Sequence, residues 1–260
     1  MEASLFWKLV RHEMNLTGDR SKEKKRQFKR GWKIGYALVM LLLFFIGTTL
    51  LIKTTDFRLS NTWYFTFGLP YMVFFIGFGH AKREWSNDTL GWWLSLPYSR
   101  LALIGAKYVA NLIQCLMILA AILVVGFIYV VYIAAITSSF NWPMIGQFMI
   151  LGCNWMLLIA LACPILIGLG QFLAISQYTN LRVITPILWF CFMGLGSMVY
   201  WSGGFFESKG NNIYIQFSGD QSVTFFPFST IFIGFIILGW VLIYFVIRLT
   251  AYLIDRKLSL

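Results

Sequence analysis

Long apolar stretches separated by short polar ones make up most of this chain. A helix that crosses a hydrocarbon core roughly 30 Å thick needs about 20 apolar residues. Six stretches meet that requirement, namely residues 34–52, 62–81, 103–136, 148–172, 183–201 and 228–247. Because every backbone polar group in lipid must be satisfied within its own segment, the pattern predicts an all-α polytopic membrane protein with six transmembrane helices.

Three residues inside these stretches lead to further expectations. Pro70 lies in the second stretch and Pro164 in the fourth, and proline removes a backbone donor, so a kink is expected at each. The third stretch is longer than a bilayer requires. Lys107, near its start, is therefore expected to extend its ammonium group to the cytoplasmic surface.

The positions of the basic residues predict which side of the membrane each loop occupies. Of the 21 lysines and arginines, 18 lie on the same side as the amino terminus, and Lys53, Arg58 and Lys209 lie on the other. Basic residues are retained on the cytoplasmic side, so both termini are expected there. Anionic lipid beside the inner leaflet then accounts for the net charge of +11, and no nucleic-acid partner is expected.

Composition supports a cell-membrane protein, with bacterial plasma membrane as the expected location. Hydrophobic residues make up 59% of the chain and the mean hydropathy is +0.73, more than a soluble protein of this length carries. The four cysteines all lie in apolar stretches and lack CxxC spacing, so neither a metal site nor a disulfide is predicted.

Two regions are distinguished along the chain. Residues 1–33 contain an amphipathic segment, residues 3–15, followed by a basic linker, and residues 34–260 form a single transmembrane domain. On a helical wheel the amphipathic segment separates a polar arc from an apolar one, which only Glu13 interrupts. This pattern predicts a helix lying in the inner membrane interface. Between the last two spans, residues 202–227 contain two β-prone runs, so a small extracytoplasmic hairpin or cap is expected.

The apolar stretches lack the groups that intramembrane catalysis requires. No Asp or Glu lies at mid-depth, there is no HExxH pair, and no GxxxxGK[ST] loop is present to hold nucleotide phosphates. Ion-coupled carriers and proton pumps place ionisable groups near the midplane, and this chain does not. We therefore expect no enzyme activity from the chain itself, no cofactor and no metal. Any energy must come from another polypeptide.

The run KREWSNDTLGWWLSLPYSR, residues 82–100, is the one amphipathic, partly charged segment between two long spans. Asp88 or Thr89 is suited to cap a short helix that Pro97 ends. Leu90, Trp93 and Leu94 would supply an apolar surface for a partner's groove, with charged groups at its edges. The alternative interpretation is a solvated loop whose tryptophans anchor the membrane interface.

This run resembles the segment after the second span in type 2 ABC exporter permeases. The pattern of that family is an acidic residue, then Gly-Thr-Leu, an apolar stretch and Leu-Pro-x-Ser-Arg. This chain departs from the pattern in two ways: Asp88 stands where the family usually has Gly, and Trp92 and Trp93 are additional. The resemblance covers the six-span layout as well. It implies a coupling helix that seats in an ATPase subunit, and the candidate coupling residues are Glu84, Asp88, Thr89, Leu90, Trp93, Leu94, Pro97, Ser99 and Arg100.

As the resemblance implies, the chain is expected to be the permease subunit of an ATP-driven exporter. ATP and magnesium would bind two copies of a separate ATPase subunit, and a second permease copy or a similar permease would complete the route, with membrane lipids around it. Amphipathic or hydrophobic cargo is favoured, such as antimicrobial peptides, drug-like or lipid-linked compounds. The alternative is a motor-free resistance or sensing protein that binds a peptide at its outer loop.

Four polar residues within the spans either line such a route or tie helices together. They are all neutral, and neutral side chains find partners readily between membrane helices, which favours the tie. Gly31 and Gly35 have the spacing of a helix-packing motif, but a single match is weak. The four candidates are Asn111, Gln114, Asn154 and Gln171.

Overall fold

The computed structural model describes residues 3–19, 30–54, 59–136, 142–201, 224–226 and 228–256. Within these ranges every regular element is a helix and none is a strand, so the all-α class is confirmed for them. The predicted hairpin of residues 202–227 lies almost wholly outside the described residues. The elements in chain order are α1 (Ala3–Asp19), α2 (Arg30–Thr54), η2 (Leu59–Thr66), α3 (Leu69–Ser86), α4 (Leu90–Ser95), α5 (Arg100–Ile136), α6 (Trp142–Ser176), η3 (Asn180–Val183), α7 (Thr185–Trp201) and α9 (Thr230–Arg256).

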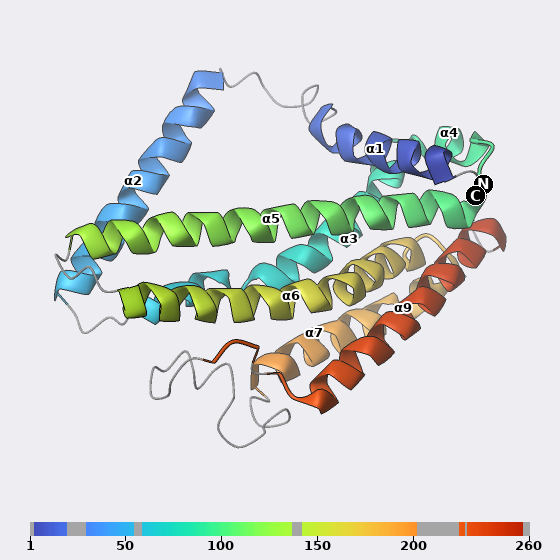
Figure 1. Ribbon diagram of the computed structural model, residues 1–260. Coiled ribbons are helices and arrows are strands. Elements are labelled where there is room, and N and C mark those ends of the chain that lie inside the picture. The colour runs from blue at the N-terminus through green and yellow to red at the C-terminus, as the bar shows by residue number, and fades with distance from the viewer. Residues whose placement is uncertain are drawn as a thin grey trace.

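Helix α6 is the centre of the bundle. It packs against α3, α5 and α9, and more lightly against α7, while α1 lies along the first part of α5 (Figure 1). Helix α2 stands away from the others and approaches them near its far end, where the Phe45 ring lies 4.8 Å from the ring of Tyr132. Most of the side chains along α2 are apolar and exposed, as expected where lipid or another chain covers them.

Three helices of the described part are long and apolar enough to cross a membrane: α5, α6 and α9. Shorter apolar stretches occur at Ile34–Leu50 in α2 and at Thr185–Gly194 in α7. These helices support a membrane protein, whereas the full set of six spans stays a prediction. The predicted boundaries of residues 103–136 agree closely with α5, but α9 continues to Arg256, well beyond the predicted end at residue 247.

The predicted single helix of residues 62–81 is wrong in its first third. A 3₁₀ helix, η2, comes first, and the α-helix starts only at Leu69 with Pro70 in its first turn. Proline is accommodated there because the first-turn amides have no intrahelical partner. Pro70 therefore begins a helix instead of kinking one, whereas Pro164 does lie inside α6.

Two glycines allow α3 and α6 to approach backbone to backbone. A Cβ atom added to Gly77 of α3 would lie 2.5 Å from the carbonyl oxygen of Ile167, and one added to Gly170 of α6 would meet the carbonyl oxygen of Phe74 as closely. Small residues at such crossings permit the close packing on which membrane helices depend. At Gly31 and Gly35, in contrast, an added Cβ atom would meet no neighbouring atom within 4 Å.

Trp63 is a core residue, although it lies at the start of the predicted span 62–81, where tryptophans commonly form an interfacial belt. Its side chain is only 3% exposed, stacks on Phe148 with ring centroids 5.0 Å apart, and donates from Nε1 to the Phe148 carbonyl at 3.1 Å. Gly126 of α5 and Gly152 of α6 leave the room that the indole fills. Two glycines on neighbouring helices, distant from Trp63 in sequence, therefore decide its burial.

Candidate functional site

A tight turn connects α3 to the short helix α4 at one end of the bundle. The Asn87 amide donates to the Arg83 carbonyl and the Thr89 amide to the Glu84 carbonyl, both at 3.0 Å. Between them Asp88 has φ of 54°, in the left-handed region that glycine adopts without steric cost. The turn thus forms with Asp88 where the resembling family usually has Gly. Helix α4 then ends at Ser95, with Leu96 extended before Pro97.

A buried ionic cluster lies beneath this turn. The Lys107 ammonium group is 2.8 Å from Glu84 Oε1 and 3.7 Å from Glu13 Oε2, and the three side chains are 6%, 7% and 14% exposed. The Thr89 hydroxyl donates to Glu84 Oε2 at 2.5 Å, and Lys107 Nζ lies 5.1 Å from the centre of the Trp93 ring. We call these residues, Glu13, Glu84, Thr89 and Lys107, the ionic cluster; it joins α1, α3, α5 and the start of α4.

The ionic cluster corrects three expectations. Lys107 does not extend to the surface, because α1 covers this part of α5 and supplies Glu13 as a second carboxylate. Glu84 is not an exposed charged edge, because it compensates Lys107 inside the bundle, as a buried charge must be compensated. Thr89 occupies the N-cap position of α4, but its side chain makes no capping hydrogen bond and bonds Glu84 instead.

The apolar side of α4 packs against the bundle and not outward. Trp93 is 5% exposed. It joins a cluster that includes Ile104 of α5 and Ile254 of α9, with the partly buried Leu90 and Leu94 against it. The predicted outward-facing position is therefore wrong for Trp93, whereas Leu90 and Leu94 are only partly buried and their coupling role stays a prediction. In this structure these three residues hold α4 in place.

The side of α4 that faces away from the bundle carries a different set of residues. Trp92 is 54% exposed, and its neighbours on this side are also exposed. Adjacent residues of a helix point in directions about 100° apart, so a short helix that packs on one side can bury Trp93 and leave Trp92 exposed, but the sequence does not say which of the two is buried. We call this surface, formed by Asn87, Asp88, Gly91, Trp92 and Ser95, the outer face of α4.

Arg100, Ser99 and Pro97 close the far end of α4. Arg100 Nη1 donates to the Leu94 carbonyl at 2.6 Å, which satisfies one of the terminal carbonyls of α4, and its Nε lies 4.0 Å from Asp255 of α9. The Ser99 hydroxyl accepts the Ala102 amide at 3.3 Å at the start of α5. Pro97 and Ser99 are exposed. Arg100 is thus only partly available to a partner.

The four polar candidates within the helices differ in their surroundings. Asn154 ties two segments together: its Nδ2 donates to the Thr224 carbonyl at 2.7 Å, and its Oδ1 accepts the Phe226 amide at 2.9 Å. Asn111 and Gln171 are 0% and 2% exposed, and Gln114 is half-buried. Asn154 therefore ties α6 to the non-helical segment before α9, and for all four residues the choice between lining a route and tying helices together stays a prediction.

Comparisons with known proteins add no assignment to this geometry. The chain matches no protein-family model, no curated protein and no solved structure. In the described part of the chain, no three His, Cys, Asp or Glu side chains are grouped so that they could hold a metal ion.

Proposed function

We propose that this chain is the membrane-spanning permease subunit of an ATP-driven exporter, and that a separate ATPase subunit binds the outer face of α4. ATP and magnesium bind the ATPase, two copies of which close on nucleotide binding. A second permease copy, identical or similar, completes the route. The exported cargo is amphipathic or hydrophobic, because the spans contain no mid-depth acid to coordinate a simple ion.

One observation carries this proposal: α4 is a short helix at the bundle end that is joined to α3, α5 and α9. Its inner side packs on α5 and α9 through Trp93, and its start is bonded to Glu84 of α3, which in turn pairs with Lys107 of α5. Its outer face ends in a large exposed aromatic side chain, Trp92, and tryptophan is enriched among the residues that dominate binding energy at interfaces.

The ionic cluster supplies the mechanical connection that such a subunit needs. A displacement of the outer face of α4 is transmitted to α3 through the hydrogen bond of Thr89 to Glu84. It is transmitted to α5 through the contact of Glu84 with Lys107. Because Glu13 contacts the same ammonium group, α1 moves with them. Closure of the ATPase would therefore displace the inner ends of three helices together and change access to the route between the two permeases.

Photo-crosslinking tests the proposal directly. A benzoylphenylalanine replaces Trp92 in the tagged, full-length chain, and cells are illuminated before the membranes are solubilised. A polypeptide that contains a GxxxxGK[ST] loop is expected in the crosslinked band, identified by mass spectrometry. The matched control replaces Trp142, which is 70% exposed and begins α6 at the opposite end of the bundle (Figure 1).

Two results would contradict the proposal. If the band crosslinked from position 92 contains no nucleotide-binding polypeptide, α4 does not have the proposed docking role. Equal crosslinking of the same ATPase from positions 92 and 142 shows that capture does not depend on this surface. The first result makes the motor-free membrane protein the better interpretation, whereas the second removes only the docking role of the outer face of α4.

A further inference from the structure

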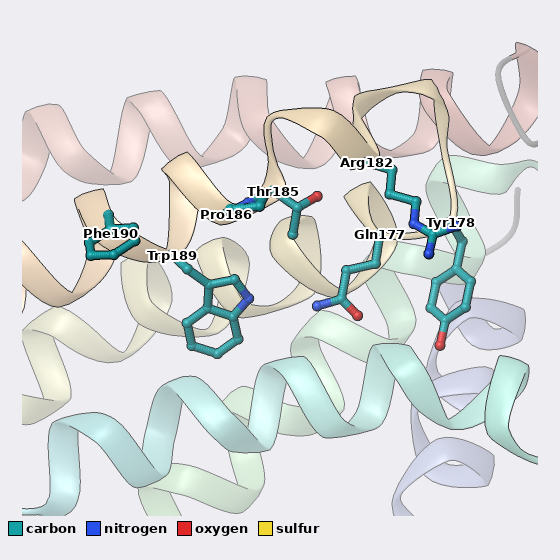
Figure 2. Close-up of a pocket in the computed structure, with 7 residues that line it drawn as sticks. All are labelled: Gln177, Tyr178, Arg182, Thr185, Pro186, Trp189 and Phe190. Atoms are coloured by element: carbon teal, nitrogen blue, oxygen red, sulfur yellow. The ribbon is translucent and has the colours of Figure 1, made fainter.

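An open cavity lies between α6, η3 and α7. Its volume is about 690 Å³, within the range of ligand sites. Gln177 and Tyr178 follow the end of α6, Arg182 belongs to η3, and Trp189 and Phe190 belong to α7. Figure 2 shows Gln177, Tyr178 and Arg182 at one end of the cavity and Trp189 and Phe190 at the other.

The polar end presents one cation whose charge is not compensated nearby. Arg182 is exposed and, among the described residues, makes no ion pair. Gln177 beside it is half-buried and offers an amide. Thr185 also borders the cavity, but its hydroxyl is already bonded to Ser176 at 3.1 Å and to the Leu181 carbonyl at 3.3 Å, so it serves the backbone turn.

The apolar end is an aromatic wall formed by Trp189 and Phe190. Trp189 packs against α3, with ring centroids 5.5 Å from both Phe74 and Phe78, and so forms a fixed side of the cavity. Phe190 is 82% exposed on the neighbouring position of α7. An exposed phenylalanine beside a fixed indole is suited to hydrocarbon contact and has nothing to offer a soluble anion.

The polar end faces the side of the bundle that the basic residues assign to the cytoplasm. Tyr178 stacks on Trp85, with ring centroids 4.7 Å apart, and Trp85 lies next to Glu84 just before the α3–α4 turn. Arg182 is therefore expected at the level of the inner headgroups, with the aromatic wall of α7 at the level of the acyl chains. The order of polar and apolar groups in the cavity matches that of a lipid in this leaflet.

We propose that this cavity holds one anionic phospholipid of the inner leaflet. The Arg182 guanidinium binds the phosphate, a geometry that its planar donors favour, and Gln177 donates a further hydrogen bond. One acyl chain lies along Trp189 and Phe190. An inorganic phosphate would leave this aromatic wall uncovered. A zwitterionic headgroup offers the same phosphate but brings its own cation, so only an anionic lipid adds net negative charge beside Arg182. The proposal is independent of the exporter function.

Native mass spectrometry of the full-length chain, released from detergent after titration with phosphatidylglycerol, tests the lipid. The unchanged chain is expected to retain one phosphatidylglycerol more tightly than phosphatidylcholine. Arg182→Gln is expected to weaken that retention at least about fivefold, and Arg182→Lys to restore part of it. Arg248→Gln is the matched control, since Arg248 is also exposed near the predicted inner surface and lies over Tyr244; it should leave retention unchanged.

A second measurement places the acyl chain. Phosphatidylglycerol with brominated chains quenches nearby indoles, and the quenched fraction is expected to fall in Trp189→Phe. Equal weakening by Arg182→Gln and Arg248→Gln would show general surface attraction and overturn the site. So would retention of phosphatidylcholine equal to that of phosphatidylglycerol, displacement of the lipid by millimolar inorganic phosphate, or a crosslink from position 190 to a second copy of the chain in place of lipid.

Discussion

Replacing Lys107 with methionine removes the ammonium group that both Glu84 and Glu13 contact, at 2.8 Å and 3.7 Å. Methionine keeps the length and the apolar stem of the lysine, so the packing of α5 changes little. The two carboxylates are left in a largely enclosed space without the cation between them. We therefore expect loss of stability from electrostatics and not from a cavity.

The geometry sets the size of the effect. At an effective dielectric constant of about 20, charges 2.8 Å apart attract by about 6 kcal/mol, and removal of one partner of a buried pair usually costs about 3 to 5 kcal/mol after relaxation. Taking about 3 kcal/mol, the thermal midpoint of a chain this size falls by roughly 6 to 12 °C. The double variant Lys107→Met with Glu84→Gln should regain more than half of that loss, because no uncompensated charge remains at Glu84.

The thermal midpoint is measured in detergent, with intrinsic tryptophan fluorescence as the signal. Chemical unfolding is measured for the same four chains of the double-mutant cycle, namely the unchanged chain, the two single variants and the double variant. Lys82→Met is the matched control, since Lys82 is an exposed lysine on α3, and it is expected to change stability by less than about 0.5 kcal/mol. The reasoning is refuted if Lys107→Met is no more harmful than Lys82→Met. It is also refuted if the two single losses simply add in the double variant.

Two further substitutions test the helix crossing and the turn. Gly77→Ala places a methyl group against the backbone of Ile167 and should lower the free energy of unfolding by about 1 to 3 kcal/mol. The control Gly79→Ala has open space at its Cβ position and should raise the free energy of unfolding by up to about 1 kcal/mol. Equal effects of the two substitutions in the same unfolding assay would contradict the close α3–α6 contact. Asp88→Gly should raise stability by roughly 0.5 to 1 kcal/mol because φ is 54° there, and a loss of stability on that change would show that the Asp88 side chain makes a stabilising contact.

The apolar pattern was most accurate for long, uninterrupted helices. Residues 103–136 were predicted as one helix and α5 is Arg100–Ile136, because a long apolar run leaves the backbone no alternative to helical hydrogen bonds in lipid. The pattern failed at residues 62–81, where proline and glycine chemistry divides the run into η2 and α3. Apolarity does not distinguish a 3₁₀ helix from an α-helix, and it does not say whether a tryptophan such as Trp63 faces lipid or another helix.

The sequence singled out residues 82–100, which form the end of α3, a turn, α4 and the start of α5, but it did not predict which of their side chains are buried. Trp92 and Trp93 are adjacent and chemically identical, and only the packing of α4 on α5 and α9 makes one exposed and the other buried. Glu84 and Lys107 each resemble a surface charge near a span end. Their pairing required α3 and α5 to lie side by side, and the contact of Glu13 with Lys107 required α1 to lie along α5.

By itself the sequence determined what is local: helical class in the described part, apolar segments of membrane-spanning length, and a short polar interruption at residues 82–100. These follow from hydrogen-bond satisfaction and from the length of each apolar run, which need no knowledge of neighbours. The tertiary structure alone decided which charges are buried, which face of α4 is available, and where a cavity opens beside Arg182. Each of these depends on helices distant in the chain meeting at a particular residue, as the contact of Gly77 with the backbone of Ile167 shows.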